Sequence, residues 1–74
     1  MLQRLRSLTA RERQIVALVC AGHSNKIIAR KLQVGEGTIK THLHVIYLKL
    51  GIENRADLLA TIIDNAQTDK MSNV

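Results

Sequence analysis

Apolar residues recur along this chain at three- and four-residue spacing in four separate segments, which is the spacing of amphipathic α-helices. Residues that can begin or end a helix lie between these segments. The candidate N-caps are Thr9 (in a capping-box pattern with Glu12), Ser24 and Asn54, and the glycines placed to end helices are Gly22 and Gly51. The pattern predicts an all-α fold, a four-helix bundle whose core is built from aliphatic side chains.

The predicted helices follow these signals. We expect helices from Thr9 to about Ala21, over 25–32, from a turn at 35–37 to Gly51, and from Asn54 to about Ala66. The domain itself is predicted to span residues 8–66. Residues 1–7 are interpreted as the remnant of a linker, and residues 67–74 as a flexible C-terminal tail.

The third predicted helix has two contrasting faces. Its apolar stripe consists of Ile39, Leu43, Ile46 and Leu50. Lys40, Thr41 and His44 lie on a separate outward arc, and Glu36 is the only acidic residue of the segment. A short helix, a tight turn and a longer helix with a basic, polar arc are typical of a helix-turn-helix, whose second helix enters the major groove of DNA. We predict that Lys40, Thr41 and His44 read base edges.

Helix N-termini offer free backbone N–H groups to phosphates. Ser24, Asn25 and Lys26 open the second helix with a hydroxyl, an amide and a charge, and Thr38 lies near the start of the third. Each of them, taken alone, is also an ordinary capping residue. Together they predict contacts with the DNA backbone.

The basic charge of the chain is concentrated in its first fifty residues. Residues 1–50 carry nine Lys and Arg against two Glu, a net charge of +7, whereas residues 51–74 have a net charge of −2. Such asymmetry is expected of a protein that meets a polyanion on one side. Plain solubility is the alternative explanation of a basic domain this small.

The fourth predicted helix has more apolar surface than one small core requires. The residues concerned are Leu58, Leu59, Ile62, Ile63 and Ala66. Either this helix is deeply buried, or part of its apolar stripe contacts a partner.

The sequence offers little support for metal binding, catalysis or membrane binding. His42 and His44 are two apart on a helix and point in different directions, so they cannot share a metal ion, and Ser24 lacks a base and an acid for catalysis. We expect no enzyme, metal site or cofactor. Membrane binding is not expected either, because no apolar run spans a bilayer and aromatic anchors are missing.

The single Cys20 lies among apolar residues and is interpreted as a buried structural thiol in a reducing cytoplasm.

Several motifs together resemble the LuxR-type DNA-binding domain of NarL- and FixJ-like bacterial response regulators and quorum-sensing regulators. They are Leu8-Thr9-x-Arg11-Glu12, Gly22-x-Ser24-Asn25-Lys26 with Ile28-Ala29, Thr38-Ile39-Lys40-x-His42, Lys49-Leu50-Gly51 and Asn54-Arg55. The resemblance covers roughly residues 8–63.

The resemblance implies a four-helix domain that binds double-stranded DNA as a homodimer, often through its last helix. The dimer residues would then be Leu59, Ile62, Ile63 and Ala66. It implies that Lys40, Thr41 and His44 read base edges and that Ser24, Asn25, Lys26 and Thr38 lie near the backbone. Glu12 is expected to pair with a basic side chain, for which we predict Arg55. RNA polymerase and, in a longer protein, a receiver domain are the further partners implied.

The chain departs from the family pattern at three positions. Gly35 stands at the N-cap of the third helix, where Ser is common, and Gly37 leaves a gap. Leu48 stands where Arg or Lys is frequent, which removes one phosphate contact. Three hypotheses therefore stay open. The chain is the effector domain of a two-component response regulator, a self-standing small LuxR-type regulator, or a protein-interaction module on a decayed helix-turn-helix.

Overall fold

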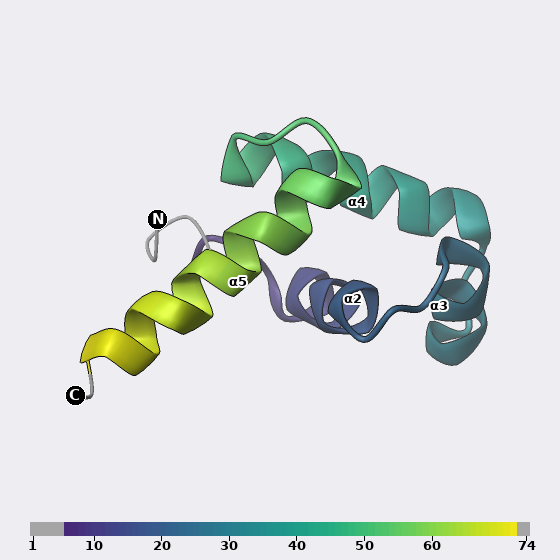
Figure 1. The fold of residues 1–74 in the computed structure, drawn as a ribbon. Helices are drawn as coiled ribbons and strands as arrows, with labels where there is room; N and C mark the ends of the chain where they lie inside the picture. The colour runs from purple at the N-terminus through teal and green to yellow at the C-terminus, as the bar shows by residue number, and fades with distance from the viewer. Residues whose placement is uncertain (1–5, 73–74) are drawn as a thin grey trace.

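Four labelled helices make up the part of the chain that the structure describes. The computed structural model describes the backbone of residues 6–72 and side chains up to Ile63. The helices, labelled as in Figure 1, are α2 (Ala10–Cys20), α3 (Asn25–Leu32), α4 (Glu36–Leu50) and α5 (Arg55–Ser72). No strand occurs within residues 6–72, so the predicted all-α class is confirmed.

The predicted N-cap residues cap the N-termini of three of these helices. The Thr9 hydroxyl accepts a hydrogen bond from the Glu12 backbone N–H at 3.1 Å, and the Glu12 carboxylate accepts one from the Thr9 N–H at 2.8 Å, which completes the capping box. The side chains of Ser24 and Asn54 each accept from the backbone N–H three residues later, at 3.3 and 2.9 Å. All three helix starts therefore follow from local sequence.

Residues with positive φ end three of the helices. Gly22 follows α2 with φ of 93°, and Gly51 follows α4 with φ of 69°, as the sequence predicts. The residue that ends α3 was not predicted: Gln33 has φ of 59°, a left-handed conformation that residues other than glycine adopt at a cost.

The start of α4 agrees only in part with the prediction. Gly35 is the N-cap, as the family pattern implies, but Glu36 is already the first helical residue, so Gly37 lies in the first helical turn and the expected turn over 35–37 is wrong. Two glycines one residue apart look like a turn in sequence. In the structure neither has a positive φ, so both fit the ordinary entry into a helix.

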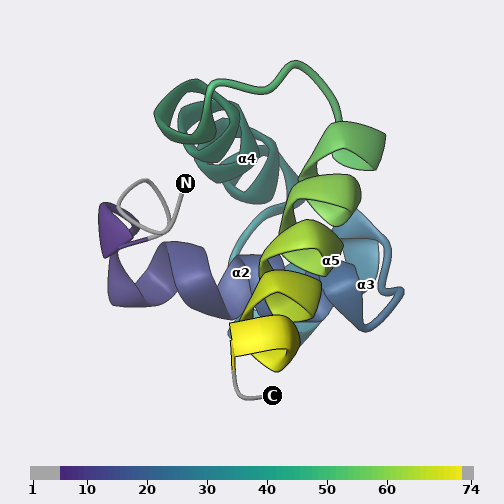
Figure 2. The ribbon, with the colours of Figure 1, turned by 60° about the vertical axis from the view of Figure 1, so that its left-hand side comes forward.

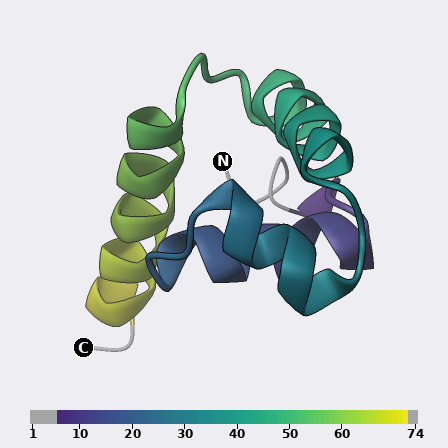
Figure 3. The same ribbon diagram turned by 90° about the vertical axis from the view of Figure 1, so that its right-hand side faces the viewer.

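All four helices contribute to one aliphatic core. The side chains without exposed surface include Ile15 of α2, Ile28 of α3, Ile39 and Ile46 of α4 and Leu58 of α5. Figure 2 shows α5 passing in front of α2, and Figure 3 shows α4 and α5 on opposite sides of the molecule with α2 and α3 between them. The core thereby fixes α4 against α3 and leaves one face of α4 free.

Two predicted features outside the core turn out differently. Cys20 is exposed, so its interpretation as a buried thiol is wrong. Successive residues of a helix point in different directions, so the adjacent Val19 lies in the core while Cys20 does not. The helix α5 continues past Ala66 to Ser72. That residues 67–74 are flexible stays a prediction, as does the linker over 1–7. Residues 1–5 and 73–74 lie outside the described part of the chain.

Candidate nucleic-acid interface

The outward arc of α4 is exposed along its length. Lys40, Thr41 and His44 are all exposed, while Ile39 and Leu43 on the opposite side are buried. The Thr41 hydroxyl donates a hydrogen bond to the Gly37 carbonyl at 3.1 Å, which fixes the side chain and leaves its oxygen lone pairs to accept. The three predicted base-reading residues therefore lie together on one free helix face.

Two residues without polar side chains, Gly37 and Leu48, lie at the ends of this arc. At 100° per residue, Gly37 and Leu48 fall on the same side of α4 as Thr41 and His44. A Cβ atom added to Gly37 would meet nothing within 4 Å, so this end of the arc is open. Leu48 is 68% exposed, the highest value among large hydrophobic side chains whose burial is described. A gap and an apolar side chain therefore flank the polar middle of the arc.

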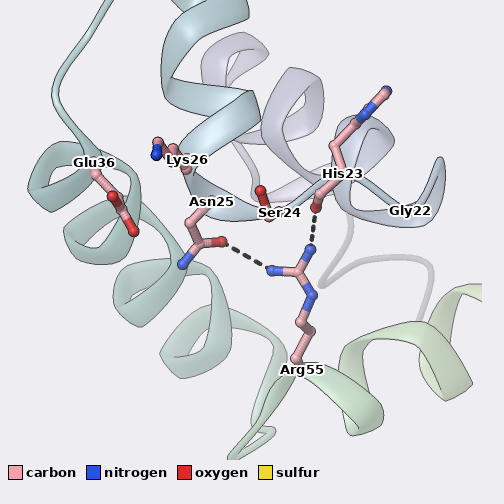
Figure 4. Close-up of a pocket in the computed structure, with 7 residues that line it drawn as sticks. All are labelled: Gly22, His23, Ser24, Asn25, Lys26, Glu36 and Arg55. Carbon is pink, nitrogen blue, oxygen red and sulfur yellow. Dashed lines mark hydrogen bonds between the residues drawn. The ribbon is translucent and has the colours of Figure 1, made fainter.

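A shallow hollow lies at the start of α3, beside the arc-bearing helix (Figure 4). Its volume is about 530 Å³. The residues around it are Gly22, His23, Ser24, Asn25, Lys26, Glu36 and Arg55. Three of the four predicted backbone-contact residues, Ser24, Asn25 and Lys26, are thus brought together. Thr38, the fourth, is exposed in the first turn of α4 and does not line the hollow.

Arg55, the first residue of α5, also lines this hollow. Its guanidinium donates one hydrogen bond to Asn25 Oδ1 at 2.9 Å and a second to the backbone carbonyl of His23 (Figure 4). The predicted pairing of Arg55 with Glu12 is therefore wrong. The first turn of α5 lies against the turn between α2 and α3, and from there the guanidinium faces the start of α3.

Lys49 takes the place that we predicted for Arg55. Its Nζ lies 2.7 Å from Glu12 Oε1 and also donates to the Ser7 carbonyl at 3.3 Å. The Glu12 residue is only 4% exposed. The hydrogen bonds from Lys49 and from the Thr9 backbone lower the pKa of Glu12, against the effect of burial. A buried glutamate requires a partner, and Lys49 can reach it because it precedes Leu50 of the buried stripe of α4.

The apolar stripe of α5 is partly used by the core. Leu58 is fully buried, and Leu59 and Ile62 are partly buried against the core, whereas Ile63 is 55% exposed. The side chain of Ala66 lies outside the described residues. One side of the helix is therefore buried, whereas Ile63 remains uncovered; contact of this stripe with a partner stays a prediction.

Metal binding and membrane insertion find no structural counterpart in the described residues. Within them, no three His, Cys, Asp or Glu side chains are grouped so that they could hold a metal ion. No helix in the described part of the chain has the length and apolarity to cross a membrane.

Residues 6–62 match the family model for bacterial regulatory proteins of the luxR family. The chain belongs to the luxR family. The monoamine regulon transcriptional regulator of Klebsiella aerogenes is 49% identical over 53 residues, which are 72% of this chain and 23% of that protein. The HTH-type transcriptional regulator MalT of Vibrio campbellii is 45% identical over 60 residues, 81% of this chain and 7% of that protein.

The chain spans about a quarter or less of the length of the curated relatives that it matches. The relationship therefore concerns the luxR-family DNA-binding domain, as the motifs on α2, α3 and α4 predict. The predicted resemblance to this family is confirmed, and so is the helix-turn-helix made of α3 and α4.

Proposed function

We propose that this luxR-family domain binds specific sequences of double-stranded DNA by inserting α4 into the major groove. The observation that carries the proposal is the exposed arc of Lys40, Thr41 and His44, held outward by a buried stripe on the same helix. These side chains supply a charged donor, a hydroxyl with a methyl group, and an imidazole that donates or accepts. Base edges in the major groove present matching acceptors, donors and thymine methyl groups.

The hollow at the start of α3 supports contacts to the DNA backbone. Ser24, Asn25 and Lys26 line it together, and Arg55 adds a second cation. Thr38 supplies a hydroxyl at the N-terminal end of α4, whose backbone N–H groups favour an anion. These residues would set the register of α4 on the duplex, while the arc reads sequence.

The wider context of the domain is part of the same proposal. We infer that it is the effector domain of a transcription regulator in a two-component system, with a receiver domain elsewhere in the protein, acting in the cytoplasm and contacting RNA polymerase. The much greater length of its relatives supports additional domains. A self-standing small regulator is the alternative. No catalytic activity is proposed for the domain.

We propose that the domain binds DNA as a homodimer through α5. The exposed Ile63 supports this, together with the partly buried Leu59 and Ile62; Ala66 is included from the sequence. Two copies on a pair of half-sites would place their α4 helices in successive major grooves about one helical turn apart.

One further candidate function has an observation in its favour. Leu48 is exposed and Gly37 leaves open space on the arc that should meet DNA. A domain that had lost DNA binding and kept a protein partner would show such positions. Its binding would respond weakly to salt, whereas neutralising several phosphates makes DNA affinity fall steeply as salt rises.

Selection of bound duplexes from a random pool, repeated at two salt concentrations, tests these proposals. A recurrent motif whose binding falls with salt is the expected result. Salt-sensitive binding without a motif would leave a nonspecific DNA binder. The absence of binding at both salt concentrations would overturn the DNA proposal in favour of the interaction module.

A further inference from the structure

We propose that Arg55 is a positioning residue: it holds the Asn25 side chain so that the amide N–H groups face outward to donate to a DNA phosphate. The inference rests on the proposed DNA binding and deepens it. Asn25 is the first residue of α3 and Arg55 the first residue of α5, thirty positions later, and both are half-buried at the hollow.

The chemistry of the two side chains determines which end of the amide faces Arg55. A guanidinium has five N–H donors and no acceptor, so only the oxygen of Asn25 can face it favourably. The 2.9 Å contact with Oδ1 has this arrangement. Figure 4 shows the amide nitrogen of Asn25 on the side away from Arg55. A reversed amide would place donors against donors, so Arg55 fixes the direction in which Asn25 donates.

The guanidinium is itself held in place. Its second hydrogen bond goes to the backbone carbonyl of His23, in the turn that precedes the Ser24 cap. Arg55 therefore joins α5 to the backbone of the turn as well as to the Asn25 side chain. A side chain that is ordered before DNA arrives loses less conformational entropy on binding. The adjacent positive charge also polarises the amide, which strengthens its N–H donors toward an anion.

A single substitution can separate this role from a merely structural one. Asn25→Asp keeps an oxygen toward Arg55 and converts a hydrogen bond from a cation to a neutral amide into an ion pair, so the folded domain should be at least as stable. The outward group, however, changes from an N–H donor to a carboxylate oxygen that repels phosphate. If Asn25 supports the fold and lies away from the DNA, this variant should bind DNA as the wild type does.

The experiment measures affinity for a selected duplex, with thermal unfolding as the control for folding. The chains compared are the wild type, Asn25→Asp, Asn25→Ala, Arg55→Ala and the double alanine variant, each at two salt concentrations. We expect Asn25→Asp to lower affinity about tenfold or more without lowering the midpoint of unfolding. Arg55→Ala should lower DNA affinity by a several-fold larger factor in the wild type than in the Asn25→Ala variant. Only in the wild type does the loss of Arg55 leave the Asn25 amide free to turn.

The background comparison also accounts for the charge of Arg55. Any effect of that charge on DNA, or of its loss on folding, remains when Asn25 is already alanine. Equal losses from Arg55→Ala in both backgrounds would overturn the positioning role, and wild-type affinity in Asn25→Asp would overturn donation by Asn25. If the wild type itself shows no salt-sensitive DNA binding, the proposed function fails as well, which is a distinct result.

Arg55→Lys provides a second measurement should Arg55→Ala fail to fold. Lysine keeps the charge but lacks the planar fork that contacts two acceptors at once. The side-chain amide signals of Asn25 in an ¹H–¹⁵N spectrum should shift when DNA is added to the wild type and shift less in this variant. An equal shift in both proteins would contradict the proposal.

Discussion

Lys49 Nζ lies 2.7 Å from the carboxylate of Glu12, so an ion pair joins the last turn of α4 to the first turn of α2. The same carboxylate completes the capping box with Thr9, and the same ammonium reaches the Ser7 carbonyl. One pair of side chains therefore fixes the start of the domain and the orientation of α4. The two charges differ in their exposure to solvent, since the Glu12 side chain is 6% exposed and that of Lys49 is 32% exposed.

Removing the cation from this pair should destabilise the domain. Lys49→Met would leave a buried carboxylate without its charged partner, and we expect the free energy of unfolding to fall by about 1–3 kcal/mol. Urea denaturation at neutral pH would measure it. An unchanged free energy of unfolding would mean that water replaces Lys49 at no cost.

The lowered pKa of Glu12 gives the stability of the domain a defined pH dependence. Because the folded protein holds the pKa below its usual value of about 4.5, the unfolded chain takes up the proton first as the pH falls. The stabilisation is therefore complete above that value and is lost as the pH falls through the folded pKa. Urea denaturation at several pH values should show a flatter acid dependence for Glu12→Gln, which keeps a capping acceptor without titrating. Identical acid dependence in both proteins would argue against Glu12 as the group responsible.

The glycine that caps α4 offers a stabilising substitution. Gly35 has the extended backbone of an N-cap but no side chain to accept a hydrogen bond, and an added Cβ would meet Thr38 Oγ1 at an ordinary 3.9 Å. We expect Gly35→Ser to raise the free energy of unfolding by about 0.5–1 kcal/mol. Gly22→Ser is the matched control, and its φ of 93° should make the same change destabilising by about 1 kcal/mol or more. The reverse order of the two unfolding midpoints would contradict this reading of α4.

Two lysines should show different kinds of effect on DNA binding. Lys40 is on the exposed arc of α4, so Lys40→Ala should cost about 1–3 kcal/mol on the selected site and relax its sequence preference. Lys26 is exposed at the hollow, where phosphate contact is proposed, so Lys26→Ala should weaken all sequences alike. Titrations against the selected duplex and a scrambled one distinguish the two. A uniform loss for both variants would remove base reading from Lys40.

Local sequence predicted the helices and much of their termination, while contacts between helices were harder to foresee. Thr9, Ser24 and Asn54 cap through bonds to residues three positions away, so their signals lie within a few residues. The pairing of Arg55 with Asn25 depends on how α5 crosses the start of α3, and nothing in either helix specifies that crossing. For the same reason, charge and spacing could not decide which cation would approach Glu12.

The exposed arc of the candidate site was predictable because helical periodicity alone separates it from the buried stripe. Lys40 and His44 are one turn apart, and their exposure follows once Leu43 is assigned to the core. The hollow was not predictable as a cavity, since it combines the start of α3 with Glu36 and Arg55 from two other helices. Gln33 likewise ends α3 in a conformation for which glycine is the usual signal.

Dimerisation through α5 predicts a loss that depends on the number of half-sites. Ile63 is 55% exposed, so Ile63→Glu should leave the fold intact while placing a charge at the proposed interface. Binding to two half-sites spaced about one helical turn apart should weaken far more than binding to one, because only the former gains from a second copy. The single half-site is the internal control, since it reports the effect of the added negative charge on DNA. Parallel titrations of the two duplexes measure both quantities, and equal losses on them would exclude Ile63 from a dimer interface.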